Sequence, residues 1–258
     1  MVRERLARTF SRTALLAGVA AVVALAWWLW MTFAFTAWPA PYWFEHRFVR
    51  TVDSPVLALE FARSERERNA VFQRENDVNP DPQKSAEAIR ALRFHTVLDC
   101  IFIPLCCGYL LLLGFSYTPR GRSRTALAAT VLALAVVAWS EDVLLLFTAG
   151  LVFVLAICKW VLLALTLIQI AGLLGRSSNR GPYSTATRRL LAVVHVAAAA
   201  LLIAGLCFSQ LPWLALGGRI VAITLCVSAI GLLGPAFAIE GECRETNPDF
   251  CQERHKAS

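Results

Sequence analysis

The chain has 258 residues, of which 57% are hydrophobic and only 17% are charged, and its formal net charge at pH 7 is +7. A soluble domain of this length carries more charge and rarely contains repeated apolar runs of about twenty residues. The composition therefore excludes an ordinary soluble fold and indicates a membrane protein.

Six apolar runs follow one another along the chain. Each is long enough, at about 1.5 Å per residue, to cross or nearly cross a hydrocarbon core of about 30 Å. A backbone in lipid must satisfy its own hydrogen bonds, so runs of this length are expected to be helices. We predict an all-α, polytopic bundle of about six spans that forms a single integral membrane domain over 1–258. The expected spans are 13–35, 94–115, 125–149, 151–174, 190–207 and 220–237.

The first run exceeds the apolar core of a signal peptide, so we expect it to stay as an anchor. The long segment 37–93 follows it, and we expect this loop on the non-cytoplasmic side with short surface helices. Its stretch "DSPVLALEFA" predicts one such helix, with Ser54 as the N-cap and Pro55 at the first helical position. Glu60 interrupts the apolar face of this helix, either as a solvated edge or by folding back towards the charges in the spans. A second helix, capped by Ser85, is expected to continue into the second span.

Charged residues inside predicted spans are the strongest functional signal, because each costs about 2.5–3.5 kcal/mol on insertion scales and marks a function or a partner. These residues are Asp99, Glu141, Asp142 and Lys159. The third and fourth spans form a hairpin around Gly150, which Glu141 precedes by nine residues and Lys159 follows by nine. The acid pair and the lysine are therefore expected at the same depth. Neighbouring helical residues point about 100° apart, so one acid should face Lys159 and the other a second helix, a cavity or water.

Two interpretations of these charges compete. One is an ion pair that positions helices, with Asp99 satisfied by His95 one turn earlier. The other is a polar chamber in the outer half of the bilayer that holds a lipid headgroup, a proton or a small polar ligand. The candidate polar cluster comprises Asp99, Glu141, Asp142, Lys159, His95 and Glu60. Three other polar residues, expected to hydrogen-bond between helices, are Thr166, Gln169 and His195.

The basic residues are unevenly distributed over the loops. Segments 1–13, 116–125 and 175–189 hold four, three and four Arg, respectively, and all fall on one side of a six-span threading. By the positive-inside rule that side is the cytoplasm, which places both termini there, including the tail 238–258. The basic excess therefore indicates topology and contact with anionic headgroups rather than a nucleic-acid partner.

No metal or cofactor is expected. The tail contains Cys243, Cys251 and His255, but the two cysteines are too far apart for a C-x₂₋₄-C zinc motif. The other six cysteines lie in apolar runs, where a thiol behaves as a small hydrophobe, so no structural disulfide is expected either.

Short motifs in 54–174 resemble a family of bacterial polytopic integral membrane proteins with no known activity. In that family an E-x-A surface helix precedes a span with D-x-x-F, a later span has D-x-x-E-N, and the next has a Lys before an aromatic residue. The matching positions here are Glu60, Asp99, Glu141 and Lys159. This chain departs from the pattern at the third motif, where Ala138 replaces the first Asp and Asp142 replaces the Asn.

The sequence contains no motif of a known catalytic class. The leading interpretation is a non-enzymatic, multi-pass protein of the bacterial cytoplasmic (inner) membrane that binds a membrane lipid, or a protein partner of unknown identity, through the polar cluster. One alternative is a membrane-embedded lipid-modifying enzyme that uses His95 and a carboxylate as acid and base. A proton-coupled carrier is the other, although the chain lacks the paired repeats and broken spans of transporters.

The threading makes a direct prediction about topology. Alkaline phosphatase fused after Val78 should be active, because this position lies in the exported loop, and the same enzyme fused to the C-terminus should be inactive. Activity from the C-terminal fusion but not from the Val78 fusion would contradict the threading.

Overall fold

The structure is a computed structural model that describes residues 16–27, 29–30, 55–64, 67, 82–117, 121–145, 150–176, 185–208, 213–225 and 227–228. Nearly all of these residues are helical, and none of those described forms a strand. This confirms the predicted all-α fold. The helices, in chain order, are α2 (Pro55–Glu60), α4 (Pro82–Tyr117), α5 (Arg122–Leu145), α6 (Gly150–Arg176) and α7 (Thr185–Cys207).

Four helices are long and apolar enough to cross a membrane. These stretches are Arg93–Tyr117, Arg122–Leu145, Leu151–Arg176 and Thr185–Cys207, and they coincide with the second to fifth predicted spans. The described part of the chain also holds two shorter apolar helices, Leu16–Trp27 and Trp213–Leu225. The first lies within the predicted span 13–35, and the second begins earlier than the expected start at 220. The structure therefore establishes four of the six expected spans.

The outward faces of these helices are strongly apolar. Leu132 on α5, Val193 on α7 and Val97 on α4 are 66%, 65% and 61% exposed. Large apolar surfaces of this kind are rare on soluble monomers, whereas lipid tails cover them at no cost. The chain is therefore a helical membrane protein.

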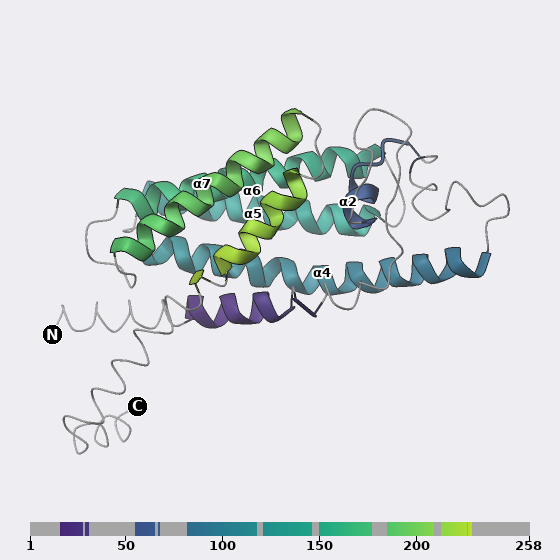
Figure 1. Cartoon of the computed structure of the whole chain (residues 1–258), viewed down its shortest axis with the longest axis horizontal. Helices are drawn as coiled ribbons and strands as arrows, with labels where there is room; N and C mark the ends of the chain where they lie inside the picture. Colours follow the sequence, from purple (N-terminus) through teal and green to yellow (C-terminus); the bar gives the residue numbers. More distant parts are fainter. Residues whose placement is uncertain are drawn as a thin grey trace, which may run out of the picture.

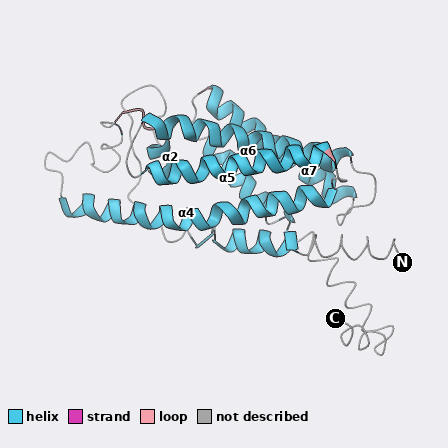
Figure 2. Ribbon diagram, turned by 180° about the vertical axis from the view of Figure 1, so that it is seen from behind, coloured by secondary structure: helices cyan, strands magenta, loops and turns pink. Residues whose placement is uncertain are grey.

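The helices α4 to α7 alternate in direction, and α4, α5 and α6 each pack against the next one along the chain (Figure 1). The helix α6 occupies the centre of the bundle, because it contacts α5 and α7 closely and also touches α4 and α2. Figure 2 shows that α2 lies at one end of the bundle, and that the first turns of α4 extend beyond the other helices at this same end. We call it the α2 end.

The helix α4 starts earlier than the sequence suggested. It begins at Pro82 and runs for 36 residues, so it is about 54 Å long. Ser85 therefore lies inside the helix rather than at its N-cap. Proline is tolerated in the first turn of a helix because the first N–H groups have no partner within it.

The helix α2 was expected to lie on the membrane surface, and this expectation is wrong. Its residues Leu57, Ala58 and Leu59 are 7%, 0% and 1% exposed, so the helix is packed into the bundle. Phe61, in the turn that follows, packs edge-on against Phe153 of α6, with ring centroids 6.1 Å apart. Pro55 is its first residue, as predicted, whereas Ser54 lies outside the described residues.

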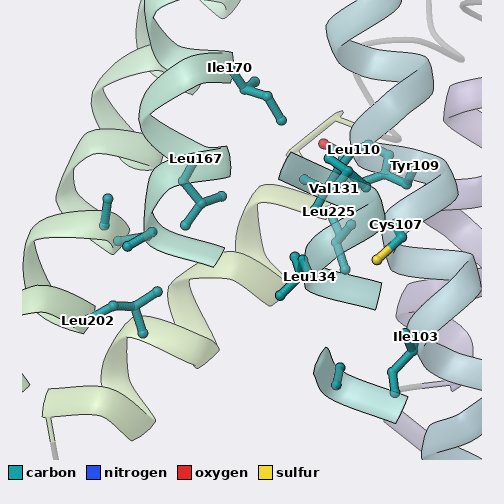
Figure 3. Close-up of a cluster of buried hydrophobic side chains, with 14 of the residues drawn as sticks. Ile103, Cys107, Tyr109, Leu110, Val131, Leu134, Leu167, Ile170, Leu202 and Leu225 are labelled. Atoms are coloured by element: carbon teal, nitrogen blue, oxygen red, sulfur yellow. The ribbon is translucent and has the colours of Figure 1, made fainter. Parts of the chain in front are cut away.

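The core between the helices is apolar over most of the bundle. Figure 3 shows part of it, with side chains from α4, α5, α6, α7 and the helix Trp213–Leu225 meeting in one cluster. Tyr109 of α4 is a polar exception, and its hydroxyl donates a hydrogen bond to Ser228. A second polar contact ties the first helix to α4, since Trp27 Nε1 donates to the carbonyl of Leu98 at 3.1 Å. Apolar side-chain packing therefore holds most of the bundle together, and the buried charged residues lie outside this apolar core.

Two glycines of α4 provide a test of this packing. A methyl group at Gly114 would collide with the buried side chain of Leu127 on α5, whereas one at Gly108 would meet nothing within 4 Å. We expect Gly114→Ala to lower the free energy of unfolding by about 1–3 kcal/mol through overpacking. Gly108→Ala should be neutral or raise it by up to about 1 kcal/mol, because alanine favours the helix. Thermal unfolding in detergent distinguishes them, and equal effects would contradict the close α4–α5 contact.

Candidate functional site

Both acids of α5 point into the bundle. Ala138, Glu141, Asp142 and Leu145 are 5%, 1%, 5% and 4% exposed. Positions three and four residues apart lie on one face of a helix, so these residues form a single inward stripe. Glu141 and Asp142 sit side by side on it, and each aims at a different neighbour.

Glu141 faces α6. Its Oε2 atom lies 2.6 Å from Nζ of Lys159, so the two residues form a buried ion pair across the α5–α6 hairpin. This contact agrees with the matched depths predicted from their equal spacing about Gly150. The sequence left open whether Glu141 or Asp142 pairs with Lys159, and in the structure the paired acid is Glu141.

Lys159 has a second partner, which comes from α2. Its Nζ atom is 2.8 Å from Oε1 of Glu60, and the other oxygen of Glu60 accepts a hydrogen bond from Trp160 Nε1 at 3.1 Å. Glu60 is only 5% exposed. Of the two alternatives for this residue, the structure therefore favours folding back into the charged layer over a solvated edge. One lysine thus ties together α2, α5 and α6.

Asp142 faces α4. Its charge interacts with that of Asp99, and the thiol of Cys100 lies within the field of both acids. Asp142 Oδ2 and Glu141 Oε1 are buried and have no hydrogen-bond partner among the described residues. At this same level Trp139 Nε1 donates to the carbonyl of Cys100 at 3.1 Å, which joins α5 to α4.

His95 and Asp99 form the α4 side of the cluster. They lie one turn apart on the same face of the helix, and both are partly exposed. The charge of His95 interacts with those of Asp99, Glu60 and Lys159. Each of the six predicted cluster residues therefore lies within electrostatic range of at least three of the others. His95 and Asp99 on α4 and Lys159 on α6 are partly exposed, whereas the other three are buried.

Three other polar residues lie apart from this cluster. Gln169 Nε2 donates to Thr130 Oγ1 at 3.1 Å across α5 and α6, as expected of a residue that links helices. Thr166 instead donates to the carbonyl of Leu162 in its own helix at 2.8 Å, so that expectation was wrong. His195 likewise bonds within its own helix, through Nδ1 and the carbonyl of Leu191 at 2.7 Å, and its buried Nε2 has no hydrogen-bond partner among the described residues.

Within the described residues, no group of three or more His, Cys, Asp or Glu side chains is arranged to hold a metal ion. The five described cysteines are Cys100, Cys106, Cys107, Cys158 and Cys207, and all are free thiols. The tail with Cys243, Cys251 and His255 lies outside the described residues. What the cluster offers is therefore carboxyl, ammonium and imidazole chemistry.

Sequence reasoning missed the role of Trp160. Its indole donates to Glu60, and Lys159 Nζ lies 5.3 Å from the centre of its ring. A methyl group added at Gly218 would lie 3.8 Å from the ring, so the ring is close to this position. An adjacent lysine and tryptophan in an otherwise aliphatic span was the available signal, since both are costly in lipid unless their polar atoms are bonded.

The chain matches no family model, no curated protein and no solved structure. The resemblance of its short motifs to a bacterial membrane-protein family stays a prediction, and any function must be argued from the cluster itself.

The ion pairs predict a specific pattern of coupling. Lys159→Met should lower the free energy of unfolding in detergent by about 3–5 kcal/mol, because it leaves Glu60 and Glu141 buried without their cation. Adding Glu141→Gln or Glu60→Gln should recover part of this loss, whereas Asp142→Asn should recover less. A double-mutant cycle measures each coupling, and values below about 0.5 kcal/mol for both Glu60 and Glu141 would contradict the assigned contacts.

Proposed function

We propose that the protein binds a polar ligand from the membrane, either a lipid or a membrane partner, at the acid cluster, and that it does so without catalysing a reaction. The observation that carries this proposal is Asp142, a carboxyl that is 5% exposed and whose Oδ2 has no hydrogen-bond partner among the described residues. Buried polar groups normally have partners, and an unpaired one in a low-dielectric interior is costly.

An ion pair that only positions helices accounts for part of the cluster. Lys159 with Glu60 and Glu141 already ties α2, α5 and α6 together. Asp142 adds no ion pair to this arrangement, and another acid, Asp99, lies within electrostatic range of it. A buried polar atom without a partner among the described residues is expected to interact with a ligand.

The position of the cluster supports access from the membrane. His95 and Asp99 are partly exposed on α4, next to lipid-facing residues such as Phe94 and Val97. The arginine asymmetry predicts the α2 end to be non-cytoplasmic, with the termini on the opposite, cytoplasmic side. We therefore propose a ligand that comes from the outer leaflet or the space beyond it.

Catalysis is the second candidate, and one observation favours it. His95 is partly exposed and interacts with the charge of Asp99, the arrangement that an acid–base pair requires. A lipid-modifying enzyme would release a changed lipid, so the same experiment separates it from a binding protein.

The binding proposal predicts which variant loses its ligand. Full-length protein should be purified in mild detergent, and its co-purified lipids identified by mass spectrometry. We expect one lipid class to be enriched over the membrane average, and Asp142→Asn to reduce that enrichment about tenfold or more, the effect of losing one charge-assisted hydrogen bond.

Thr166→Val is the matched control, because this buried hydroxyl bonds only within its own helix. It should leave the enrichment unchanged. Equal lipid profiles for the wild type, Asp142→Asn and the membrane extract would contradict binding at the cluster. A lipid product that accumulates with the wild type, but not with His95→Gln, would favour the enzyme.

A further inference from the structure

The acid cluster contains more acidic than basic side chains. Its four carboxyl groups belong to Glu60, Asp99, Glu141 and Asp142, and the only basic side chains among its six residues are Lys159 and His95. Lys159 forms ion pairs with Glu60 at 2.8 Å and with Glu141 at 2.6 Å. Its charge is thus paired with acids from α2 and α5. Asp99 lies in the field of His95 and Lys159, and Asp142 lies in that of Lys159, but neither acid forms an ion pair with Lys159 as Glu60 and Glu141 do.

The cluster also has more hydrogen-bond acceptors than donors. Glu141 Oε1 and Asp142 Oδ2 are buried and accept no hydrogen bond from the described residues, although their side chains are 1% and 5% exposed. An ionised carboxylate has about four acceptor sites and no donor, so in their ionised form these acids need a partner that donates. A partner that is both a donor and positively charged would satisfy both deficits at once.

Two common classes of ligand do not fit these deficits. A phosphate would add negative charge beside Asp99 and Asp142, and the lysine that would attract it already has two carboxylate partners. A metal ion needs several ligands in a fixed geometry, and no suitable group of three exists among the described residues. An ammonium group fits better, because it is a compact cation with up to three N–H donors.

The partly exposed side of the cluster lies along α4. Asp99 is partly exposed there, whereas Asp142 on α5 is only 5% exposed. Trp139, which is 43% exposed and bonded to the carbonyl of Cys100, flanks this side. A cation that approaches from the membrane would meet Asp99 before Asp142.

We propose that the ligand of the cluster carries a primary ammonium group, which binds between Asp99 and Asp142 and donates a hydrogen bond to Asp142 Oδ2. This inference rests on the proposed function and adds the chemical class of its ligand. The ammonium can belong to an ethanolamine lipid or to a soluble amine, and both present the same chemistry to the two acids.

The test uses full-length protein in nanodiscs that contain equal amounts of phosphatidylethanolamine, phosphatidylcholine and phosphatidylglycerol. Native mass spectrometry then reports which lipid stays bound. We expect phosphatidylethanolamine to exceed phosphatidylcholine by about tenfold or more, because choline has the same charge but no N–H to donate. Ethanolamine added to protein in nanodiscs of phosphatidylcholine alone tests the soluble source, with tryptophan fluorescence as the readout.

Three variants assign the binding to the cluster. Asp142→Asn and Asp99→Asn should each abolish the preference for the ammonium, and Thr166→Val should keep it. Asp99→Asn is the safer of the first two for folding, because Asp99 is partly exposed, and a thermal unfolding curve checks that each variant is folded.

The outcomes separate this inference from the proposal on which it rests. A preference for phosphatidylglycerol that Asp142→Asn abolishes would overturn the proposal of an ammonium ligand, but it would leave the proposal of binding at the cluster intact. Equal binding of phosphatidylethanolamine and phosphatidylcholine would overturn it as well. If neither a lipid nor ethanolamine binds in a way that depends on Asp99 or Asp142, the proposed function itself fails.

Discussion

The double ion pair of Lys159 is the contact on which this end of the bundle depends. A single ammonium joins three elements, because Glu60 comes from α2, Glu141 from α5 and Lys159 itself from α6. In water such a pair would contribute little, but in a membrane interior the loss of one partner leaves a charge that nothing else can satisfy. The position of α2 follows from this interaction together with the apolar contacts of Leu57 to Leu59.

The rest of the cluster has a different physical character. Asp142 on α5 and Asp99 on α4 lie within electrostatic range of each other, and among the described residues neither forms an ion pair with Lys159 as Glu60 and Glu141 do. Natural proteins keep such unfavourable groups mainly at functional sites. Lys159 thus pairs with two of the four acids, Glu60 and Glu141, and forms no ion pair with the other two.

Much of this arrangement could be predicted from the sequence. The long apolar runs predicted the helices, because a segment in lipid must satisfy its own backbone hydrogen bonds and a helix is the main structure that does so within one segment. The depth of Lys159 relative to Glu141 followed from counting residues about Gly150, since the short connection between α5 and α6 fixes where residues of an antiparallel pair meet. The identity of the paired acid did not follow, because it depends on the rotation of α5 about its axis.

The predictions that failed concern contacts that no local pattern encodes. Six residues of α2 look like a surface helix, because its partner surface is formed by residues about one hundred positions later. Thr166 was expected to bond across helices, but a threonine in a helix can always bond to the carbonyl four residues earlier. The start of α4 was placed at Ser85 because the capping pattern is strong there, and the helix simply begins a turn sooner.

The distance along the chain between Glu60 and Lys159 has a consequence for how the protein is assembled. The two residues are 99 positions apart, so Glu60 is synthesised well before its cation exists. Glu141 and Lys159, in contrast, lie on adjacent helices and can enter the bilayer together as an ion pair. The α2 segment can complete its contacts only after α6 has been inserted, so its docking follows the insertion of the α5–α6 hairpin.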